Sequence, residues 1–328
     1  MTEPGSAGAP SRLGDTAGAD PVLSVVIPSW NTRDLLRECL RTLDEAAKPT
    51  TEVIVVDNAS ADGSADMVAE EYPAVHLVRN TENTGFAKGC NRGIAEVRGR
   101  YVLIHNADTE VWPDALELLI AWLDEHPTHG AAAPRLVNAD GSTQGGCMAF
   151  PSLATPLWFG TPLERWFPDS RELTRYFLRD WDHEDDRDVD QPPAACFLVR
   201  KSVLDEVGAF DEDLWLFFND VDLSLRLAKA GHRTRFVHGA RVLHHVGAST
   251  SQFASMHVEW QKNRLHYYRK HFGRAAGWWV KGCVTWTFLD HVGVQVLRGL
   301  RRKLGSTKAP QPEAVAPFWA AYKEFLKR

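Results

Sequence analysis

Acidic and polar side chains follow two β-like runs of the chain, where they could bind a charged ligand. Asp57, Asn58 and Ser60 end or follow the run 52–57, and Asp108 follows the run 101–105. In an open parallel sheet, ligands bind outside the carboxyl ends of the strands. The Asp57 carboxylate can accept a hydrogen bond from N3–H of uracil or thymine, a donor that cytosine lacks. The alternative is that residues 57–60 cap the following helix.

Asp108 is also a candidate ligand for a divalent cation. An acidic side chain that leaves a buried strand, with the short polar Asn106 two residues before it, suits one Mg²⁺ or Mn²⁺ shared with diphosphate oxygens. A single Asp at a strand end also commonly forms a turn, so the residue type alone leaves both roles open.

The segment after the first strand lacks the glycines of a dinucleotide-binding loop. It consists of Pro28, Ser29, Trp30 and Asn31, whereas a Rossmann loop needs glycines so that the backbone can approach a pyrophosphate. A bound nucleoside diphosphate would therefore need its charge neutralised in another way. A divalent cation held by carboxylates is the obvious means.

Short β-branched runs alternate with helical stretches from residue 23 onward, which predicts an α/β fold with a mostly parallel sheet. We expect strands at 23–28, 52–57, 75–79 and 101–105, and helices at 34–47, 64–71, 86–97 and 113–125. After 131–137 strands and helices no longer alternate regularly. Residues 158–191 are expected to be an inserted lid or acceptor loop, and its acidic run, 182–190, is expected to be solvated. Later expected elements are strands at 194–199, 235–237 and 241–243, and helices from Lys201 and at about 221–230.

The composition is that of a globular protein without a general attraction for nucleic acid. Of the 328 residues, 44% are hydrophobic and 24% are charged, which excludes disordered, collagen-like and coiled-coil chains. The 37 basic and 43 acidic residues give a net charge of −6, so no nucleic-acid partner is expected. The cysteines form no CxxC pair, which favours reduced thiols at Cys39, Cys90, Cys147, Cys196 and Cys283.

Both ends of the chain depart from the α/β pattern. Residues 1–21 are rich in Gly, Ala, Pro and Ser without the apolar core of a signal peptide, so we expect a disordered leader and a cytoplasmic protein. In 278–304, apolar and aromatic residues are interrupted by Lys281, Asp290 and His291 and end in basic residues. These charges disfavour a spanning helix. A peripheral contact with the inner face of the membrane, a homodimer contact and packing on the chain's own domain remain open.

Six motifs in order resemble those of family 2 glycosyltransferases of GT-A fold, and are most similar to the bacterial rhamnosyltransferase-like branch. They lie within residues 23–272 and are VVIPSWN (25–31), VIVVDNAS (53–60), NTGFAKGCNRG (83–93), HNADTEV (105–111), GAFDEDLWLFFNDVDLSLRLAKAG (208–231) and VLHHVGAS (242–249). Two positions depart from the family pattern. The metal motif contains Asn106, Ala107 and Asp108, so only Asp108 is a strong ligand, and the usual Glu-Asp-x-Asp segment begins with Asn219.

The resemblance implies an inverting displacement, in which an acceptor hydroxyl attacks the anomeric carbon of a nucleotide sugar and the nucleoside diphosphate leaves. Asp220 matches the family position of the base that takes the hydroxyl proton. Residues two apart on a helix face different ways, so Asp222 is expected to have another role. It can pair with Arg226 at i+4, which is structural.

The resemblance also implies the other contacts of the site. Of His244 and His245, only one can point inward from a strand, and His244 is expected to complete the metal site with Asp108. Asn83 and Gly85 have the alternatives of a helix cap and tight packing. Trp215, Phe218 and Asn219 are acceptor-site candidates. The expected donor contacts are Pro28, Ser29, Trp30, Asn31, Asp57, Asn58, Ser60, Asn83, Gly85, Phe86, Lys88, Asn91, Asn106, Ala107 and Asp108.

We therefore expect a GT-A domain at 22–272, with a nucleotide-sugar-binding half at 22–137 and an acceptor and catalytic half at 138–272. A helical extension follows at 273–328. The expected function is metal-dependent transfer of a sugar, favoured to be rhamnose, from a UDP- or dTDP-sugar to a hydroxyl of a glycan, a lipid-linked intermediate or a small molecule. A non-catalytic nucleotide-sugar or glycan-binding protein is the alternative, because Asn106 and Asn219 replace common carboxylates.

Overall fold

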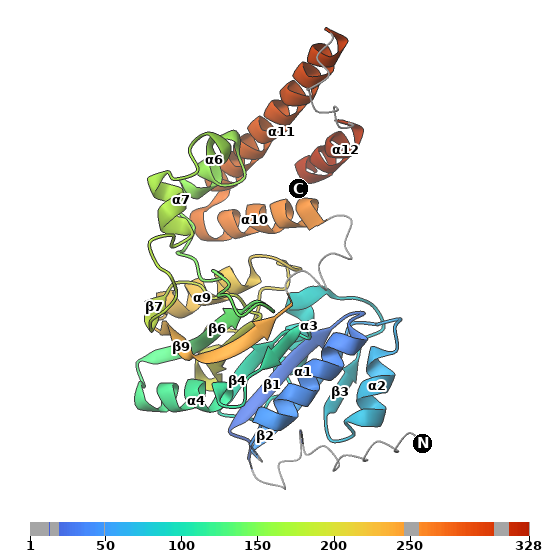
Figure 1. Cartoon of the computed structure of the whole chain (residues 1–328), viewed down its shortest axis with the longest axis vertical. Helices are drawn as coiled ribbons and strands as arrows, with labels where there is room; N and C mark the ends of the chain where they lie inside the picture. Colours follow the sequence, from blue (N-terminus) through green and yellow to red (C-terminus); the bar gives the residue numbers. More distant parts are fainter. Residues whose placement is uncertain (1–12, 14–19, 49, 246–255, 305–314, 328) are drawn as a thin grey trace.

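A central sheet with helices on both faces forms most of the molecule, and helices at the C-terminal end extend away from it (Figure 1). The computed structural model describes residues 13, 20–48, 50–245, 256–304 and 315–327. The predicted α/β class with a helical extension is confirmed. Most of the predicted leader, and residues 246–249 of the last motif, lie outside the described residues.

The sheet has the order β3-β2-β1-β4-β8-β6-β9-β5, and β7 also pairs with β9. The first four strands of this order are parallel, as expected. In contrast, β8 is antiparallel between β4 and β6, and β5 and β7 are antiparallel to β9. The strands are β1 (Leu23–Ser29), β2 (Thr51–Asp57), β3 (His76–Arg79), β4 (Tyr101–His105), β5 (Thr109–Val111), β6 (His129–Val137), β7 (Arg187–Val189), β8 (Cys196–Arg200) and β9 (Arg233–His244).

Two hydrophobic cores cover the two faces of the sheet. Successive strand residues point to opposite faces, so Val25 and Ile27 of β1 enter one core and Val26 enters the other. Helices α1, α2 and α4 pack on the first face, and α3, α8 and α9 on the second. These helices are α1 (Arg33–Ala46), α2 (Ser64–Glu71), α3 (Gly85–Ile94), α4 (Ala115–Glu125), α8 (Lys201–Val207) and α9 (Asn219–Lys229).

Strand β9 sets the geometry beside the metal motif. It is continuous over Arg233–His244, whereas the sequence suggested two separate short strands. Its last residues pair with β5, with Thr109 opposite His244. Because β5 directly follows Asp108, this register brings His244 beside that carboxylate.

The segment between β6 and β8 is more ordered than the sequence suggested. It contains α5 (Thr155–Trp158), α6 (Pro162–Trp166), α7 (Arg171–Tyr176) and β7. The prediction that 182–190 is a solvated loop is wrong for its second part, since β7 joins the sheet beside β9. Asp188 there forms ion pairs with Arg233 and Arg235 of β9, which hold the acidic strand in place.

Helix α10 (Met256–Phe272) ends the expected GT-A domain, and the C-terminal extension comprises α11 (Arg274–Lys303) and α12 (Val315–Leu326). These helices share a core that includes Leu265, Tyr268 and Val280, and Leu214 and Phe218 from the preceding half also enter it. No helix in the described parts of the chain is both long enough and apolar enough to cross a bilayer. The five cysteines are buried and free of disulfides.

Candidate active site

The carboxyl ends of β1, β2 and β4 bring the predicted donor-binding segments to one edge of the sheet. These strands are neighbours, so the residues that follow them, 29–31, 57–60 and 106–108, lie side by side. Asp57 is buried, and its Oδ2 accepts a hydrogen bond from the Ser60 N–H at 3.0 Å. Its Oδ1 is buried and has no hydrogen-bond partner among the described residues. Because buried polar atoms are normally satisfied, this oxygen is available to a ligand donor.

The loops after β1 and β2 hold each other in place. The Asn31 side chain accepts from the Ala61 N–H at 2.7 Å, and the Asn31 N–H donates to the Ser60 hydroxyl at 2.9 Å. Asn31 and Ala59 have φ of 52° and 59°, a left-handed conformation that is unfavourable for Ala. The hydrogen bonds between the two loops hold this strained conformation at the ligand edge. The other predicted contacts of the first loop are Pro28, Ser29 and Trp30.

Asp108 and His244 face each other at the same edge. The Asp108 carboxylate is buried, and no hydrogen-bond partner of its Oδ1 lies in the described part of the chain. This Oδ1 lies 3.6 Å from Nε2 of His244. Burial raises the pKa of Asp108, against the attraction of His244. Burial likewise lowers the pKa of His244, against the attraction of Asp108. The His245 N–H donates to the Asp108 carbonyl at 2.9 Å, but its ring faces Glu110, with Nε2 2.8 Å from Oε1.

The orientation of His244 tests whether this pair fits a cation. Its Nδ1 lies 3.0 Å from Oε1 of Gln144, and the Gln144 amide nitrogen donates to the His244 carbonyl at 2.8 Å. The amide orientation makes Nδ1 the protonated nitrogen, so Nε2 presents a lone pair toward Asp108. Two lone-pair atoms facing each other are stabilised by a cation between them. The residues therefore fit a divalent cation with oxygen and imidazole ligands. Gln144 was not predicted, since nothing in the spacing connects it with His244.

A short turn positions Asp108. The Thr109 hydroxyl donates to the Asn106 carbonyl at 2.6 Å and lies 2.8 Å from Nε2 of His105. Burial lowers the pKa of His105 to about 3, so this histidine is neutral and structural. Ala107 is buried, and Oδ1 of Asn106 is a further buried oxygen without a partner.

Asp220 lies in the first turn of α9 and is partly buried. Its Oδ1 accepts from the Val221 N–H at 2.9 Å, and its Oδ2 lies 3.4 Å from the Ala194 nitrogen. Burial raises the pKa of this carboxyl, although these backbone hydrogen bonds oppose the effect. A carboxylate with a raised pKa is a stronger base, which suits a group that takes a hydroxyl proton.

One backbone segment connects Asp220 with the metal motif. Ala194 contacts Asp220, and the carbonyl of the next residue, Ala195, accepts from the Asn106 N–H at 2.9 Å. Cys196 then pairs with His105 across β8 and β4. Asp108 and Asp220 thus lie near the same short segment, 194–196, at one edge of the sheet.

The first backbone N–H groups of α3 are hydrogen-bonded to other parts of the protein. The Gly85 N–H donates to the Asn83 side chain at 3.0 Å, and the Phe86 N–H donates to the Trp215 carbonyl at 2.8 Å. Gly85 has φ 86°, and a Cβ there would lie 2.4 Å from the Trp215 ring. The alternatives of a cap and tight packing therefore hold for Asn83 and Gly85. Lys88 is exposed on this helix.

Two predicted donor contacts are engaged in structural hydrogen bonds. The Asn58 amide nitrogen donates to the Gly85 carbonyl, and its oxygen accepts from Asn80 and Thr84. Asn91 bonds both the carbonyl and the N–H of Phe210, each at 2.9 Å. Their amides hold α3 against the neighbouring loops rather than facing a ligand.

Two acceptor-site candidates are buried. Phe218 packs against Trp260 and Tyr267 of α10, with ring centroids 5.6 and 5.5 Å away. The Asn219 side chain is buried and bonds the Leu216 carbonyl and the Asp220 N–H. The structure therefore does not place Phe218 and Asn219 at an acceptor surface, because their side chains are used internally. Trp215 is partly buried over the start of α3.

Asp222 is structural, and its predicted pairing with Arg226 is confirmed. The carboxylate is fully buried and lies 2.8 Å from Arg226 and 2.7 Å from both Lys270 and His271 of α10. Burial opposes ionisation, but the bonds from His271 and Lys270 and the attraction of Arg226 hold the pKa of Asp222 far below its usual range. This cluster joins α9 to α10.

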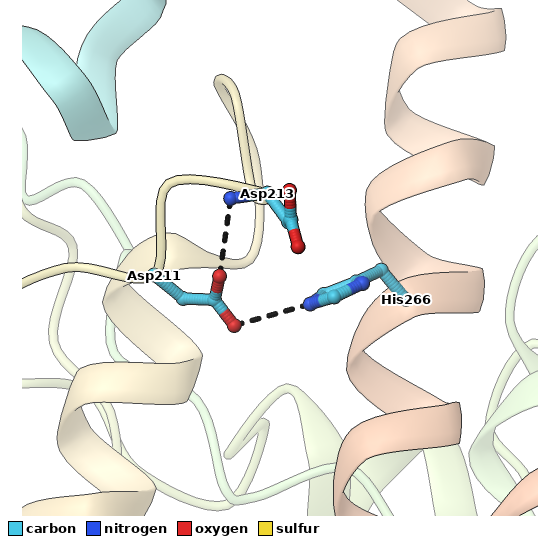
Figure 2. A group of neighbouring side chains, drawn as sticks. All are labelled: Asp211, Asp213 and His266. Carbon is cyan, nitrogen blue, oxygen red and sulfur yellow. Dashed lines mark hydrogen bonds and ion pairs between the residues drawn. The ribbon is translucent and has the colours of Figure 1, made fainter.

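A second acidic group lies between the loop before α9 and helix α10. Asp211, Asp213 and His266 point toward one another (Figure 2), and their ligand atoms lie within 4.8 Å. However, Asp211 Oδ2 already accepts from His266 at 3.1 Å and from Lys270 at 2.7 Å. A lysine on the same carboxylate supplies the charge that a cation would bring, so this group is an ion-pair cluster.

Comparisons with known proteins show the family and the fold of the chain. The family model for glycosyl transferase family 2 matches residues 24–208, more than half of the chain. The N-acetylglucosaminyl-diphospho-decaprenol L-rhamnosyltransferase of Mycobacterium tuberculosis (strain ATCC 25618 / H37Rv) is 28% identical over 310 residues, which are 86% of this chain and 97% of that protein.

Two solved structures share the fold. The mannosyltransferase PcManGT from Pyrobaculum calidifontis, in complex with GDP-Man and Mn²⁺, has a TM-score of 0.54 at 19% identity, over 97% of this chain and 86% of that one. GalNAc-T7 with UDP, GalNAc and Mn²⁺ has a TM-score of 0.52 at 15% identity, over 93% and 55% of the two chains. The comparisons support an enzyme over the alternative of a non-catalytic binding protein. The chain belongs to glycosyl transferase family 2, has the GT-A fold and is a glycosyltransferase.

Proposed function

We propose that this enzyme transfers a sugar, favoured to be rhamnose, from a UDP- or dTDP-sugar to a hydroxyl of a lipid-linked acceptor, with inversion and with a divalent cation. The observation that carries the proposal is the position of Asp108 and Asp220 near one segment, 194–196. Similarity to a rhamnosyltransferase over most of both chains supports the sugar and the acceptor class. A glycan or a glycosylated small molecule is the second acceptor class.

The donor base is bound through Asp57. Its buried Oδ1 lacks a partner and lies at the edge where β1 and β2 end. Uracil and thymine both offer N3–H as a donor on the same edge of the ring. This contact favours UDP- and dTDP-sugars equally. Discrimination between them depends on the shape of the site around the base and the ribose.

Asp108 and His244 would hold the divalent cation, either Mg²⁺ or Mn²⁺. The facing Oδ1 of Asp108 and Nε2 of His244 are suitable ligand atoms. The contact of His244 Nδ1 with Gln144 orients the imidazole for this role. When bound, such a cation offsets the negative charge that develops on the departing nucleoside diphosphate.

Asp220 acts as the base. Its carboxylate takes the proton of the acceptor hydroxyl while the hydroxyl oxygen forms its bond to the anomeric carbon and the bond to the diphosphate oxygen breaks. Attack from the face opposite the leaving group inverts the configuration. The raised pKa of Asp220 favours its action as a proton acceptor.

The acceptor enters from the side of segment 158–191, which packs beside the C-terminal extension. We place the enzyme in the cytoplasm, at the inner face of the membrane, where a lipid-linked acceptor would be presented. The rhamnosyltransferase relative, which by its name acts on a lipid-linked sugar, supports this arrangement.

Nucleotide release by the purified chain tests the proposal. The protein is incubated with Mn²⁺, with dTDP-rhamnose or a UDP-sugar, and with or without a polyprenyl-diphosphate N-acetylglucosamine acceptor. Acceptor-dependent release of dTDP, absent from the Asp220→Asn variant, is expected. Saturable donor binding in a thermal-shift assay with no release for any acceptor would overturn the transferase assignment.

A further inference from the structure

The outward side of α11 carries a long apolar stripe. At about 100° per residue, its exposed apolar side chains fall within an arc of about 100° around the helix. Gly282 and Gly293 lie in the same arc, and the charged residues of α11 lie outside it. From its first to its last residue the stripe spans roughly 40 Å. It consists of Trp278, Leu289, Val296, Leu297, Leu300 and Leu304.

Among the described residues, none covers this stripe. Trp278 and Leu304, at its two ends, are 70% and 87% exposed. The opposite side of α11 lines a cavity of about 430 Å³ together with Thr161, Arg165 and Phe318, and it contacts α10 and α12. Figure 1 shows α11 extending away from the sheet past α6. The stripe is therefore the free face of a helix whose other face is packed.

The segment before β8 widens the same apolar surface. Leu153 and Trp166 are more than half exposed. The Trp279 ring nitrogen donates to the Leu153 carbonyl at 2.9 Å, and the rings of Trp166 and Trp286 lie 6.4 Å apart. Apolar side chains of segment 150–167 and of α11 thus lie side by side. An apolar surface of this extent indicates a contact with a partner.

The charges on the rest of α11 indicate what the partner is. Helix α11 contains six Lys and Arg residues and one acidic residue, Asp290. Four of the basic residues, Arg298, Arg301, Arg302 and Lys303, gather in its last two turns, and Lys281 lies 5.2 Å from the Trp278 ring. A parallel pair of these helices would bring the two basic ends together with no acidic residue in the stripe to balance them, and an antiparallel pair would leave each basic end without an acidic partner from the stripe. An anionic partner is complementary.

We propose that the stripe of α11 binds the surface of a bilayer that contains anionic lipids, with the helix lying in the plane of the interface. Apolar and tryptophan side chains would enter the boundary between headgroups and acyl chains, while the basic end attracts the negative headgroups. Because segment 150–167 shares this surface, the same contact brings the acceptor side of the enzyme to the lipid. The proposal does not depend on the identity of the transferred sugar.

Vesicle flotation tests the proposal with the full chain. Phosphatidylcholine vesicles with phosphatidylglycerol should carry the protein to the top of a sucrose gradient, and added salt should weaken the binding. The double variant Leu297→Glu/Leu300→Glu should bind at least about tenfold more weakly. The variant Arg301→Gln/Arg302→Gln/Lys303→Gln should lose up to about fivefold per charge on the anionic vesicles only.

The same substitution elsewhere is the control. Leu118 on α4 is an exposed leucine outside the extension, so Leu118→Glu should float like the unmodified chain. Equal flotation of Leu297→Glu/Leu300→Glu and Leu118→Glu would overturn the proposal. So would absence of flotation combined with a dimer, detected by light scattering, that Leu297→Glu/Leu300→Glu dissociates. Transfer to a short water-soluble acceptor, measured in parallel, separates failure of membrane binding from failure of the proposed reaction.

Discussion

The carboxylates at the edge of the sheet and those between α9 and α10 have opposite surroundings. Asp57 and Asp108 each keep a buried oxygen that lacks a hydrogen-bond partner in the described structure. Asp222 is more deeply buried, yet three basic side chains contact it. Asp211 likewise contacts Lys270 and a histidine.

Residue type alone does not separate these two groups, because both contain aspartates close to α9 or to strand ends. The partners do. A buried carboxylate that is already paired stabilises the fold, and removing either partner exposes the other to the cost of an unpaired buried charge. A carboxylate oxygen left without a partner is unfavourable until a ligand donor or a cation reaches it. The four predictions that follow test this distinction, from the largest expected effect to the smallest.

Replacing Asp220 should have the largest effect. Asp220→Asn removes the base but keeps the shape of the side chain, so kcat should fall by about 10² to 10⁴. Donor binding, measured as a thermal shift with dTDP-rhamnose and Mn²⁺, should stay within about twofold. Turnover close to that of the unmodified enzyme would remove Asp220 from the role of base.

Replacing Asp108 should weaken the response to metal. Asp108→Asn keeps the volume but loses the charge, so kcat/KM at a fixed Mn²⁺ concentration should fall by about 10². Titration of Mn²⁺ against donor-dependent stabilisation would show the loss directly. Asp213→Asn, in the ion-pair cluster of Figure 2, is the matched control and should leave the Mn²⁺ titration unchanged. The opposite result would move the metal site to that cluster.

Replacing Asp222 should reduce stability rather than catalysis of the folded enzyme. Asp222→Asn leaves Arg226 and Lys270 without their buried anion, which should lower the free energy of unfolding by about 3 kcal/mol. Asp211→Asn, whose carboxylate is partly exposed, should lower it by less than about 1 kcal/mol. Urea unfolding of both variants checks the difference. Equal losses of unfolding free energy in the two variants would show that burial does not make the ion pairs of Asp222 stronger than those of Asp211.

The contribution of Asp222 should depend on pH in a defined direction. Its pKa is lowered by folding, so its stabilising effect is complete above its ordinary value, about 4, and is lost as the pH falls toward the lower folded value. The difference in unfolding free energy between the unmodified chain and Asp222→Asn should therefore be constant from about pH 7 to 5 and shrink below about pH 4. A difference that grows on acidification would contradict the pairing.

Elements that depend on local sequence were predicted well. The strands β1, β2 and β4 are short apolar runs, and helix α2 has the predicted bounds, because hydrophobic periodicity and turn residues lie within each segment. The pairing of Asp222 with Arg226 was predicted for the same reason, since residues four apart on a helix are neighbours. The order of strands in the second half was not predicted. Insertion of β8 between β4 and β6 joins residues about 100 positions apart.

The candidate site divides in the same way. Asp57, Asp108, Asp220 and His244 were found from their motifs, and the structure brings Asp108 and His244 together. Four other residues were predicted to contact the donor or the acceptor, namely Asn58, Asn91, Phe218 and Asn219. Their side chains are used in structural contacts, which the sequence could not reveal because the partners lie in distant segments. The acidic run 182–190 was misjudged because its partners are the arginines of β9.

The amino-acid sequence by itself determined the family, the alternating strands and helices, and the carboxylates available for chemistry, since these depend on residue types and short spacings. Only the tertiary structure decided which carboxylates are free. Lys270 and His271 reach Asp222 from 48 and 49 residues away, whereas Asp108 meets His244 across β5 and β9 with no Lys or Arg among the described residues paired to it. The charge of a side chain is local, but the neighbours that neutralise it are set by how distant segments pack.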